Sequence, residues 1–245
     1  MRSMLITGIF SLFCLLSTGQ SVRILIVTGG HSFNEPAFYN LFKSMDSIAF
    51  DTVSQPRAGD LWSGGLANIY DVIVFYDMTS EISGASKKGF LEMCDAGLPL
   101  LFLHHSLCSY QNWPEYKNIV GGKYYMEPVP GKNKASRYKH DISLEIFPAG
   151  SPHPIVSHTL GSKGSFVLTD EGYADIEVIP DVTPLLMTSH PDCFPLVGWT
   201  RRYKNSPVIY LMPGHDEKTY SHPMYLSLVR NSILWLSDQK KHTKQ

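Results

Sequence analysis

Histidine and acidic side chains recur along this chain at points where apolar segments end. The clearest case is LPLLFLHHSLCSY at residues 98–110, where an apolar run leads directly into His104 and His105. The other cases are His31, Asp77, Asp170 with Glu171, and His215 with Asp216. Imidazoles exchange protons near neutral pH, and imidazoles and carboxylates together bind divalent metals. We therefore expect these residues to carry the chemistry of the protein.

The apolar segments that end in these residues are predicted to be buried strands. In the N-terminal half they lie at residues 22–28, 50–54, 71–77 and 98–103. Helices are predicted between them at residues 35–45 and 83–96. Such alternation is typical of a parallel, doubly wound sheet with right-handed crossovers. Ligands bind these sheets at the carboxyl ends of the strands, so the polar side chains should meet there.

After Tyr110 the pattern changes to shorter and more varied elements. Alternating polarity over residues 141–147 predicts an antiparallel or edge strand, and a final amphipathic helix is predicted at residues 224–237. Further strands are predicted at residues 166–169, 184–188, 195–201 and 207–212, and short helices at residues 113–120 and 155–160. We predict one α/β domain over residues 22–240, with a mainly parallel three-layer core and antiparallel strands added in the C-terminal half.

The composition excludes some classes of protein. The chain has 245 residues, is 43% hydrophobic and carries a formal net charge of −1, without a basic stripe that would bind nucleic acid. Residues 1–21 combine Arg2, an apolar stretch and small residues, which predicts a cleaved signal peptide. We therefore expect export to the periplasm or the extracellular space, without stable membrane insertion after cleavage.

Three cysteines remain after the predicted cleavage, namely Cys94, Cys108 and Cys193. Their spacing fits no metal or redox motif, so we expect buried small side chains with at most one disulfide. Cys108 lies too far beyond the central strand to be the nucleophile of a cysteine amidohydrolase. Ser106 lacks the flanking glycines of a serine nucleophile elbow. Both side chains are therefore weak candidates for a nucleophile.

A histidine and carboxylate site is the remaining interpretation. It would combine His31, His104 or His105, and His215 with Glu171 as acid, base or ligand. The set suits zinc, and it equally suits metal-free acid–base catalysis, since no HxH or HExxH spacing is present. Aromatic residues that could pack on sugar rings flank the same predicted edge, namely Tyr76, Tyr110, Trp113, Tyr124, Tyr125 and Tyr173.

With these segments in place, the sequence resembles the trehalose-utilisation (ThuA-like) family, whose fold is like the class I glutamine amidotransferase domain. The matching segments are IVTGGH at 26–31, FLHHS at 102–106 followed by Trp113 and Gly121-Gly122, HPI at 153–155, TDEGY at 169–173, and PVIY at 207–210 with GHD at 214–216 before the helix that contains Trp235. The resemblance implies that His31, His104, Glu171, Tyr173 and His215 belong to the site. His105 stands where a small residue is usual. Because no cysteine stands at the sharp turn directly after the central strand, amidotransferase activity is not implied.

These observations lead to one hypothesis and two alternatives. We expect an exported hydrolase or lyase that acts on trehalose, another glucoside or a keto-disaccharide. His31, His104, His105, Glu171 and His215 would be catalytic, with or without a divalent metal such as zinc. Asp77, Trp113, Tyr173 and Asp216 would bind substrate. The alternatives are a non-catalytic carbohydrate-binding protein, and an amide or ester hydrolase that uses Cys108 or Ser106. The oligomeric state stays open, with a homodimer as one alternative.

Overall fold

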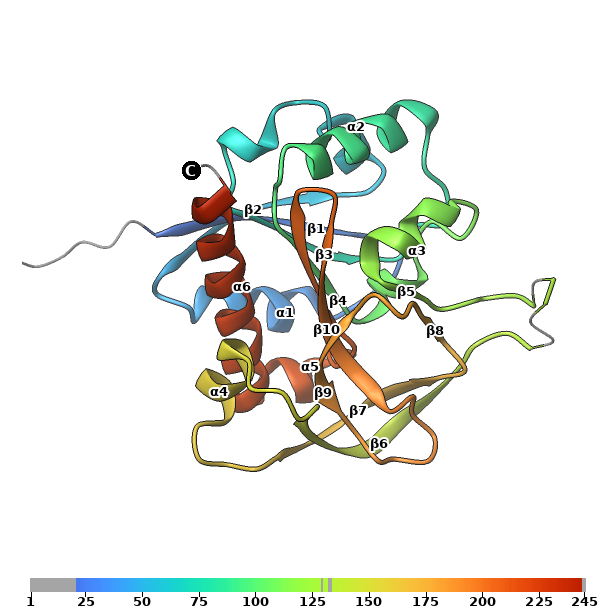
Figure 1. The fold of residues 1–245 in the computed structure, drawn as a ribbon, viewed down its shortest axis with the longest axis vertical. Helices are drawn as coiled ribbons and strands as arrows, with labels where there is room; N and C mark the ends of the chain where they lie inside the picture. The colour runs from blue at the N-terminus through green and yellow to red at the C-terminus, as the bar shows by residue number, and fades with distance from the viewer. Residues whose placement is uncertain (1–20, 129, 132–133, 244–245) are drawn as a thin grey trace, which may run out of the picture.

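The computed structural model describes residues 21–128, 130–131 and 134–243 (Figure 1). Apart from Ser21, the predicted signal peptide lies outside these residues. The described part of the chain forms a nine-stranded sheet in the order β2-β1-β3-β4-β11-β10-β9-β6-β7. The first five in this order are parallel, namely β2 (Ile48–Ser54), β1 (Val22–Gly29), β3 (Val72–Asp77), β4 (Leu100–Leu103) and β11 (Ser206–Leu211). The others are antiparallel, namely β10 (Leu196–Tyr203), β9 (Thr183–Met187), β6 (Arg137–Pro148) and β7 (Phe166–Ala174).

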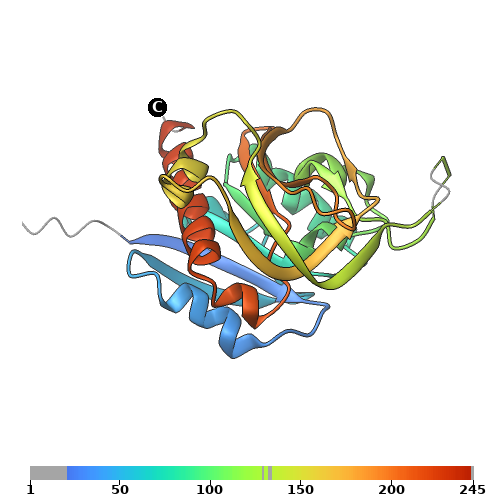
Figure 2. The same ribbon diagram turned by 90° about the horizontal axis from the view of Figure 1, so that it is seen from below.

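Helices cover both faces of the parallel strands. They are α1 (Glu35–Lys43), α2 (Gly84–Asp95), α3 (Pro114–Val120), α4 (Pro154–Leu160), α5 (Glu217–Tyr220) and α6 (Pro223–Thr243). Adjacent residues of β3 point to opposite faces, and their partners identify each layer. Phe75 stacks on Phe90 of α2, whereas Tyr76 stacks on Phe38 of α1. Figures 1 and 2 show α1 and α6 on one side of the parallel strands and α2 and α3 on the other.

The predicted fold class is confirmed. The strands and helices of the N-terminal half lie within a few residues of their predicted positions, because long apolar runs and capped helices are strong local signals. For example, Asn34 caps α1 with Pro36 in its first turn, and Ser83 caps α2. Shorter elements complete the fold, namely η1 (Arg57–Asp60), η2 (Leu66–Asn68), η3 (His104–Cys108), β5 (Gly122–Lys123) and β8 (Glu177–Val178).

One prediction about the sheet is wrong. Asp170 and Glu171 were expected just beyond the end of a strand over residues 166–169, but they lie inside β7, which continues to Ala174. The strand continues because residues 172–174 pair with residues 137–139 of β6, beyond a bulge in that strand. The two acidic residues are therefore fixed by a hairpin rather than carried on a loop.

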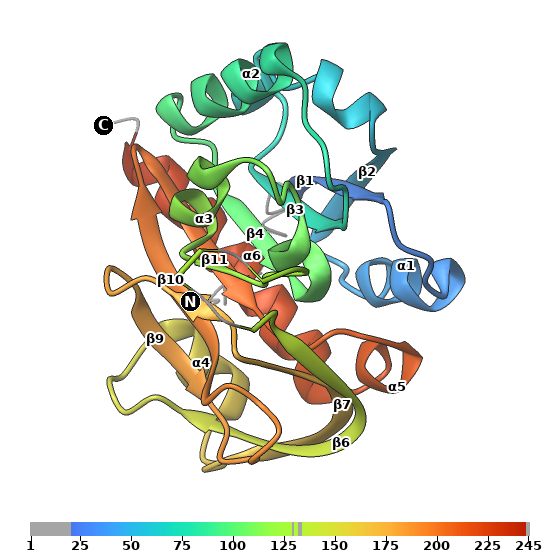
Figure 3. The ribbon, with the colours of Figure 1, turned by 90° about the vertical axis from the view of Figure 1, so that its right-hand side faces the viewer.

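The β6–β7 hairpin bends back over the parallel sheet. From β4 to β7 the sheet order counts five steps, which would span about 24 Å if the sheet were flat. Glu171 of β7 nevertheless lies within hydrogen-bond distance of His104, which directly follows β4. The hairpin can do this because only Phe147 and Pro148 of β6 pair with β9. Figure 3 shows β6 and β7 extending away from β9 toward α5.

The described residues contain no helix with both the length and the apolar character needed to cross a bilayer. Cys94, Cys108 and Cys193 are all buried with free thiols. The core around them is aromatic and aliphatic, and it is continuous from the parallel strands to the antiparallel strands.

Candidate functional site

His104 is the central residue of the candidate site. It is the first residue after β4, and its φ of +46° lies in the left-handed region, which costs a residue other than glycine about 1–3 kcal/mol. Such a strained turn between a strand and a helix projects a side chain above the edge of a sheet. The imidazole is 0% exposed, and its Nδ1 lies 2.7 Å from the carbonyl oxygen of Met212. Nδ1 must therefore carry a hydrogen, because a carbonyl only accepts.

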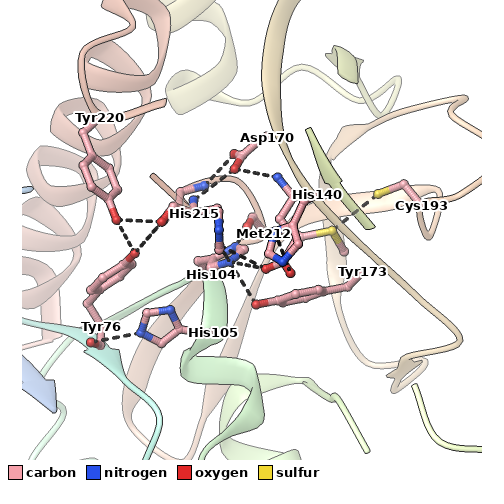
Figure 4. Close-up of polar contacts among 12 residues, drawn as sticks. Tyr76, His104, His105, His140, Asp170, Tyr173, Cys193, Met212, His215 and Tyr220 are labelled. Atoms are coloured by element: carbon pink, nitrogen blue, oxygen red, sulfur yellow. Dashed lines mark hydrogen bonds and ion pairs between the residues drawn. The ribbon is translucent and has the colours of Figure 1, made fainter. Parts of the chain in front are cut away.

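Three further polar groups, from Glu171, Tyr173 and His215, reach the same imidazole from distant parts of the chain, and Figure 4 labels the last two beside His104. Glu171 Oε2 lies 2.9 Å from His104 Nε2, and His215 Nδ1 lies 3.3 Å from the same nitrogen. His215 Nδ1 also lies 3.2 Å from Glu171 Oε2. The Tyr173 hydroxyl is 3.0 Å from His104 Nε2, and its ring stacks on the imidazole. The sequence analysis predicted that these four residues belong to the site, and the structure brings them together.

The charges in this cluster depend on one another. Although burial raises it, the pKa of Glu171 is held below its ordinary value by hydrogen bonds from His104 and His215. The same carboxylate raises the pKa of His215 through its hydrogen bond. Glu171 is therefore an anion at neutral pH, in a place where a proton or a metal cation is needed to balance it.

A buried carboxylate fixes the backbone around the cluster. Asp170 Oδ1 accepts from the backbone N–H groups of Glu171 at 2.8 Å and His215 at 3.0 Å, and Oδ2 accepts from Gly214 N–H at 2.8 Å. The side chain thus ties β7 to the segment between β11 and α5, as Figure 4 shows. Burial raises the pKa of Asp170. The sequence analysis placed this residue among the polar side chains at the expected edge but gave it no catalytic or binding role.

The backbone on the other side of His215 is held by two tyrosines. The Tyr76 hydroxyl donates to the Gly214 carbonyl at 2.8 Å, and the Tyr220 hydroxyl donates to the His215 carbonyl at 2.9 Å. Gly214 has a φ of +134°, and a Cβ at this position would lie 2.4 Å from the hydroxyl oxygen of Tyr225. Only glycine fits this close approach, which accounts for the Gly-His sequence after β11.

The cluster forms the floor of a pocket of about 370 Å³, a volume suited to a small organic ligand. The predicted residues His31 and His105 also line this pocket, but neither touches Glu171 by hydrogen bond or ion pair in the described structure. His105 packs between Tyr76 and His31, and burial lowers its pKa well below the usual value. Burial also lowers the pKa of His31. His104, not His105, is therefore the central imidazole.

One wall of the pocket was missed by the sequence analysis. Tyr138 and His140 are two residues apart on β6, so they share a face, and both line the pocket. His140 Nδ1 lies 3.5 Å from Glu171 Oε1. A bulge follows in β6, where Asp141 has a φ of +53° and forms an ion pair with Lys218. The alternation of residues 137–140 is the only signal for this wall, since the hairpin's partner is not evident from local sequence.

Three residues predicted to bind substrate do not line the pocket. Trp113, the residue just before α3, packs against Phe90 and Tyr116 in the core. Asp216 caps α5 by accepting from Lys218 N–H. Asp77 is fully buried and accepts from the Gln55 side-chain amide at 3.0 Å. Asp77 ends β3 and Asp216 follows β11, as predicted, but the contacts of all three side chains are with the fold.

Asp77 should make the stability of the protein depend on pH. Burial raises its pKa to about 7, so the folded protein holds this proton more tightly than the unfolded chain does. The stability that protonated Asp77 contributes is fully present below pH 4 and is lost as the pH rises to about 7. The free energy of unfolding should fall by up to about 4 kcal/mol over this range. In Asp77→Asn we expect the free energy of unfolding, measured with urea, to lose this fall between pH 4.5 and 8. Asp238→Asn, at an exposed position of α6, is the control. Parallel curves of unfolding free energy against pH for wild type and Asp77→Asn would contradict the prediction.

Neither alternative nucleophile is placed to react. Cys108 borders the pocket but is 4% exposed, and burial raises the pKa of its thiol far above the usual value. A buried thiol with a raised pKa is a poor nucleophile. Ser106 is fully buried, and no described residue hydrogen-bonds its hydroxyl. Its carbonyl oxygen instead accepts from Tyr116.

Comparison with known proteins agrees with this fold and with the resemblance seen in the sequence. No curated sequence compared with this chain matches it. A ThuA-like protein from Parabacteroides merdae superposes with a TM-score of 0.71 at 17% identity, over 89% of this chain and 90% of that one. A ThuA-like protein from Bacteroides uniformis superposes with a TM-score of 0.64 at 20% identity, over 90% of this chain and 93% of that one. A cytoplasmic protein from Salmonella typhimurium LT2 superposes with a TM-score of 0.59 at 12% identity, over 90% of this chain and 99% of that one. The model of the ThuA family, described as trehalose utilisation, matches residues 23–236. The chain therefore belongs to the ThuA family.

Proposed function

We propose that the pocket binds a saccharide or an oxidised saccharide, such as trehalose or its keto derivative, and that the His104–Glu171–His215 cluster acts on it. The observation that carries this proposal is the meeting of these three groups at the floor of a pocket of about 370 Å³. Glu171 is an anion, and His104 and His215 are imidazoles at hydrogen-bond distance from it. Such a cluster can accept a proton from a sugar carbon or hydroxyl and return it to a leaving oxygen.

The mouth of the pocket supports a sugar as the ligand. Met126 and Tyr138 are among the large apolar side chains that are most exposed in the described structure, at 43% and 58%, and both line this pocket. Exposed apolar surface that gathers at a pocket marks a place where a ligand is bound. A tyrosine ring offers a flat face to the C–H groups of a sugar, while the histidines below offer partners for its hydroxyls. The family's association with trehalose utilisation points to the same class of ligand.

Turnover of a defined panel tests this proposal. The purified protein is incubated with trehalose, its keto derivative and a simple glucoside, and the products are separated by chromatography. We expect wild type to convert a member of the panel and His104→Gln to lose at least about 100-fold of that activity. Binding by calorimetry without product would favour the carbohydrate-binding alternative. Neither binding nor product from any panel member would contradict the saccharide assignment.

Tyr138 should contribute to binding rather than to reaction. Replacing Tyr138 with Ala removes the exposed ring at the pocket mouth, and we expect the affinity for the best panel member to fall about 5- to 10-fold. Lys139→Ala is the matched control, because this neighbour points to the other face of β6 and pairs with Asp192. Calorimetric titrations of both variants measure the effect. Equal affinity in both would show that the ring does not touch the ligand.

We also propose that the protein is exported and acts outside the cytoplasm. The support for this is the sequence of residues 1–21, with Arg2 ahead of an apolar stretch and small residues before Val22. Fractionation of cells that produce the full chain, with mass determination of the mature N-terminus, tests export directly. A chain that retains residues 1–21 in the cytoplasm would contradict it.

A further inference from the structure

Three ligand atoms at the floor of the pocket form a small triangle. Its sides are 2.9 Å from His104 Nε2 to Glu171 Oε2, 3.2 Å from His215 Nδ1 to Glu171 Oε2, and 3.3 Å between the two nitrogens. A metal ion with bonds of roughly 2.05 Å separates neighbouring ligands by about 3.3 Å in a tetrahedron and about 2.9 Å in an octahedron. All three sides fall within this interval, so one ion above the triangle can reach every corner.

In its neutral form the His104 ring cannot donate a hydrogen bond to Glu171, although the Tyr173 hydroxyl can donate to its Nε2 at 3.0 Å. His104 Nδ1–H donates a hydrogen bond to the Met212 carbonyl, so in the neutral ring Nε2 presents a lone pair. Glu171 Oε2, which also has only lone pairs, lies 2.9 Å away. Two acceptors so close require a proton or a cation between them. Metal-bound histidines commonly donate their other ring N–H to a backbone carbonyl or a carboxylate, as His104 Nδ1 does to Met212.

The three groups are also held in place by separate parts of the fold. His104 follows β4, Glu171 lies in β7, and His215 precedes α5, with the backbone of the last two fixed by Asp170. The His104 and Glu171 side chains are 1% and 7% exposed, whereas that of His215 is 24% exposed toward the pocket. Ligands that are already positioned bind a metal without a large ordering cost. The pocket side leaves room for a further ligand, as at catalytic rather than structural zinc sites.

We propose that His104 Nε2, Glu171 Oε2 and His215 Nδ1 bind one divalent first-row metal ion, with zinc as the best match. Two imidazoles and one carboxylate are the protein ligands of one class of catalytic zinc site. The proposal narrows the five candidates of the sequence analysis to three, because the His105 ring faces the Tyr76 carbonyl and His31 is not part of the cluster. An ion here would polarise an oxygen of a bound ligand, and the site does not depend on that ligand being a saccharide.

Metal titration of the purified, untagged protein tests the site. After dialysis against a chelator, zinc chloride is added in a calorimeter, and bound zinc is counted by elemental analysis. We expect one zinc per chain and a rise in melting temperature on binding. His215→Gln, at the partly exposed corner, should weaken zinc binding at least about 100-fold while the apo protein stays folded. His31→Gln, at the same pocket but outside the triangle and without an ion pair to Glu171, should keep a zinc affinity within about threefold of wild type.

The outcomes separate this inference from the proposed function. Absence of zinc binding at about 100 µM metal would overturn the metal site. Equal weakening of zinc binding in His215→Gln and His31→Gln would overturn the choice of ligands. One zinc per chain without saccharide binding would support the site and contradict the saccharide proposal. Saccharide turnover by a protein that binds no added zinc would support the saccharide proposal and contradict the site.

Discussion

Replacing Glu171 with Gln should reduce turnover of the best saccharide substrate by about 10²–10⁴-fold. The amide has nearly the same shape, but it removes the negative charge that faces His104 and His215 at 2.9 and 3.2 Å. It also exchanges an oxygen that only accepts for a group that can be a donor. Steady-state kinetics with the panel member that wild type converts would measure the loss, and circular dichroism would verify that the variant is folded.

Glu145→Gln is the matched control for this variant. Glu145 lies on the neighbouring strand β6, is exposed and accepts from the Ser165 hydroxyl, far from the pocket lining. The control should keep wild-type kinetics. Unchanged turnover in Glu171→Gln would remove the carboxylate from the reaction and leave the pocket as a binding site.

Replacing Asp170 with Ala should cost about 3–5 kcal/mol of unfolding free energy and abolish the site. Three backbone N–H groups would lose their acceptor together, the buried ones of Glu171 and Gly214 and the partly buried one of His215. Each unsatisfied buried donor costs about 1–3 kcal/mol, although water that enters the gap would recover part of the loss. Urea unfolding would measure the stability, and saccharide turnover would report on the site.

Two further variants make this result specific. Asp170→Asn keeps one acceptor oxygen but turns an NH₂ group toward a backbone donor, so it should still lose most of the activity while losing less stability than the alanine variant. Asp216→Asn should change neither property much, because asparagine caps a helix about as well as aspartate does at the start of α5. Full activity in Asp170→Asn would show that the tie between β7 and the β11–α5 segment is not needed.

Much of the parallel half of the molecule is predictable from local pattern. The apolar runs that end in His31, Asp77 and His104 each form a strand of the central sheet, and the helices between them begin at capping residues. A continuous apolar run of this length has few ways to be buried other than as an interior strand. The prediction that imidazoles meet at one edge followed from this, because parallel strands end on the same side.

The antiparallel half was harder to predict from the sequence, because its β6–β7 hairpin has weak local signals. Residues 137–140 begin β6 ahead of a bulge, and the lysine and asparagine residues before them suggest a loop. The wall that carries Tyr138 and His140 was therefore missed. Asp77 and Trp113 show the opposite error, because they were predicted to bind substrate but are buried. A polar or aromatic residue near the carboxyl edge of the sheet can still turn into the core. Side-chain direction at a strand end depends on neighbours that lie far away in the sequence.

The sequence by itself determined the fold class, the family and the set of histidines near the carboxyl edge, because strand and helix periodicity is encoded in adjacent residues. Tertiary structure alone decided which imidazole is central. The hairpin of β6 and β7 joins the sheet through Phe147 and Pro148 and then bends over it, which brings Glu171 to His104 rather than to His105. That bend depends on contacts between distant residues, such as those of Asp170 with Gly214 and His215. Such contacts cannot be predicted from the pattern of neighbouring residues.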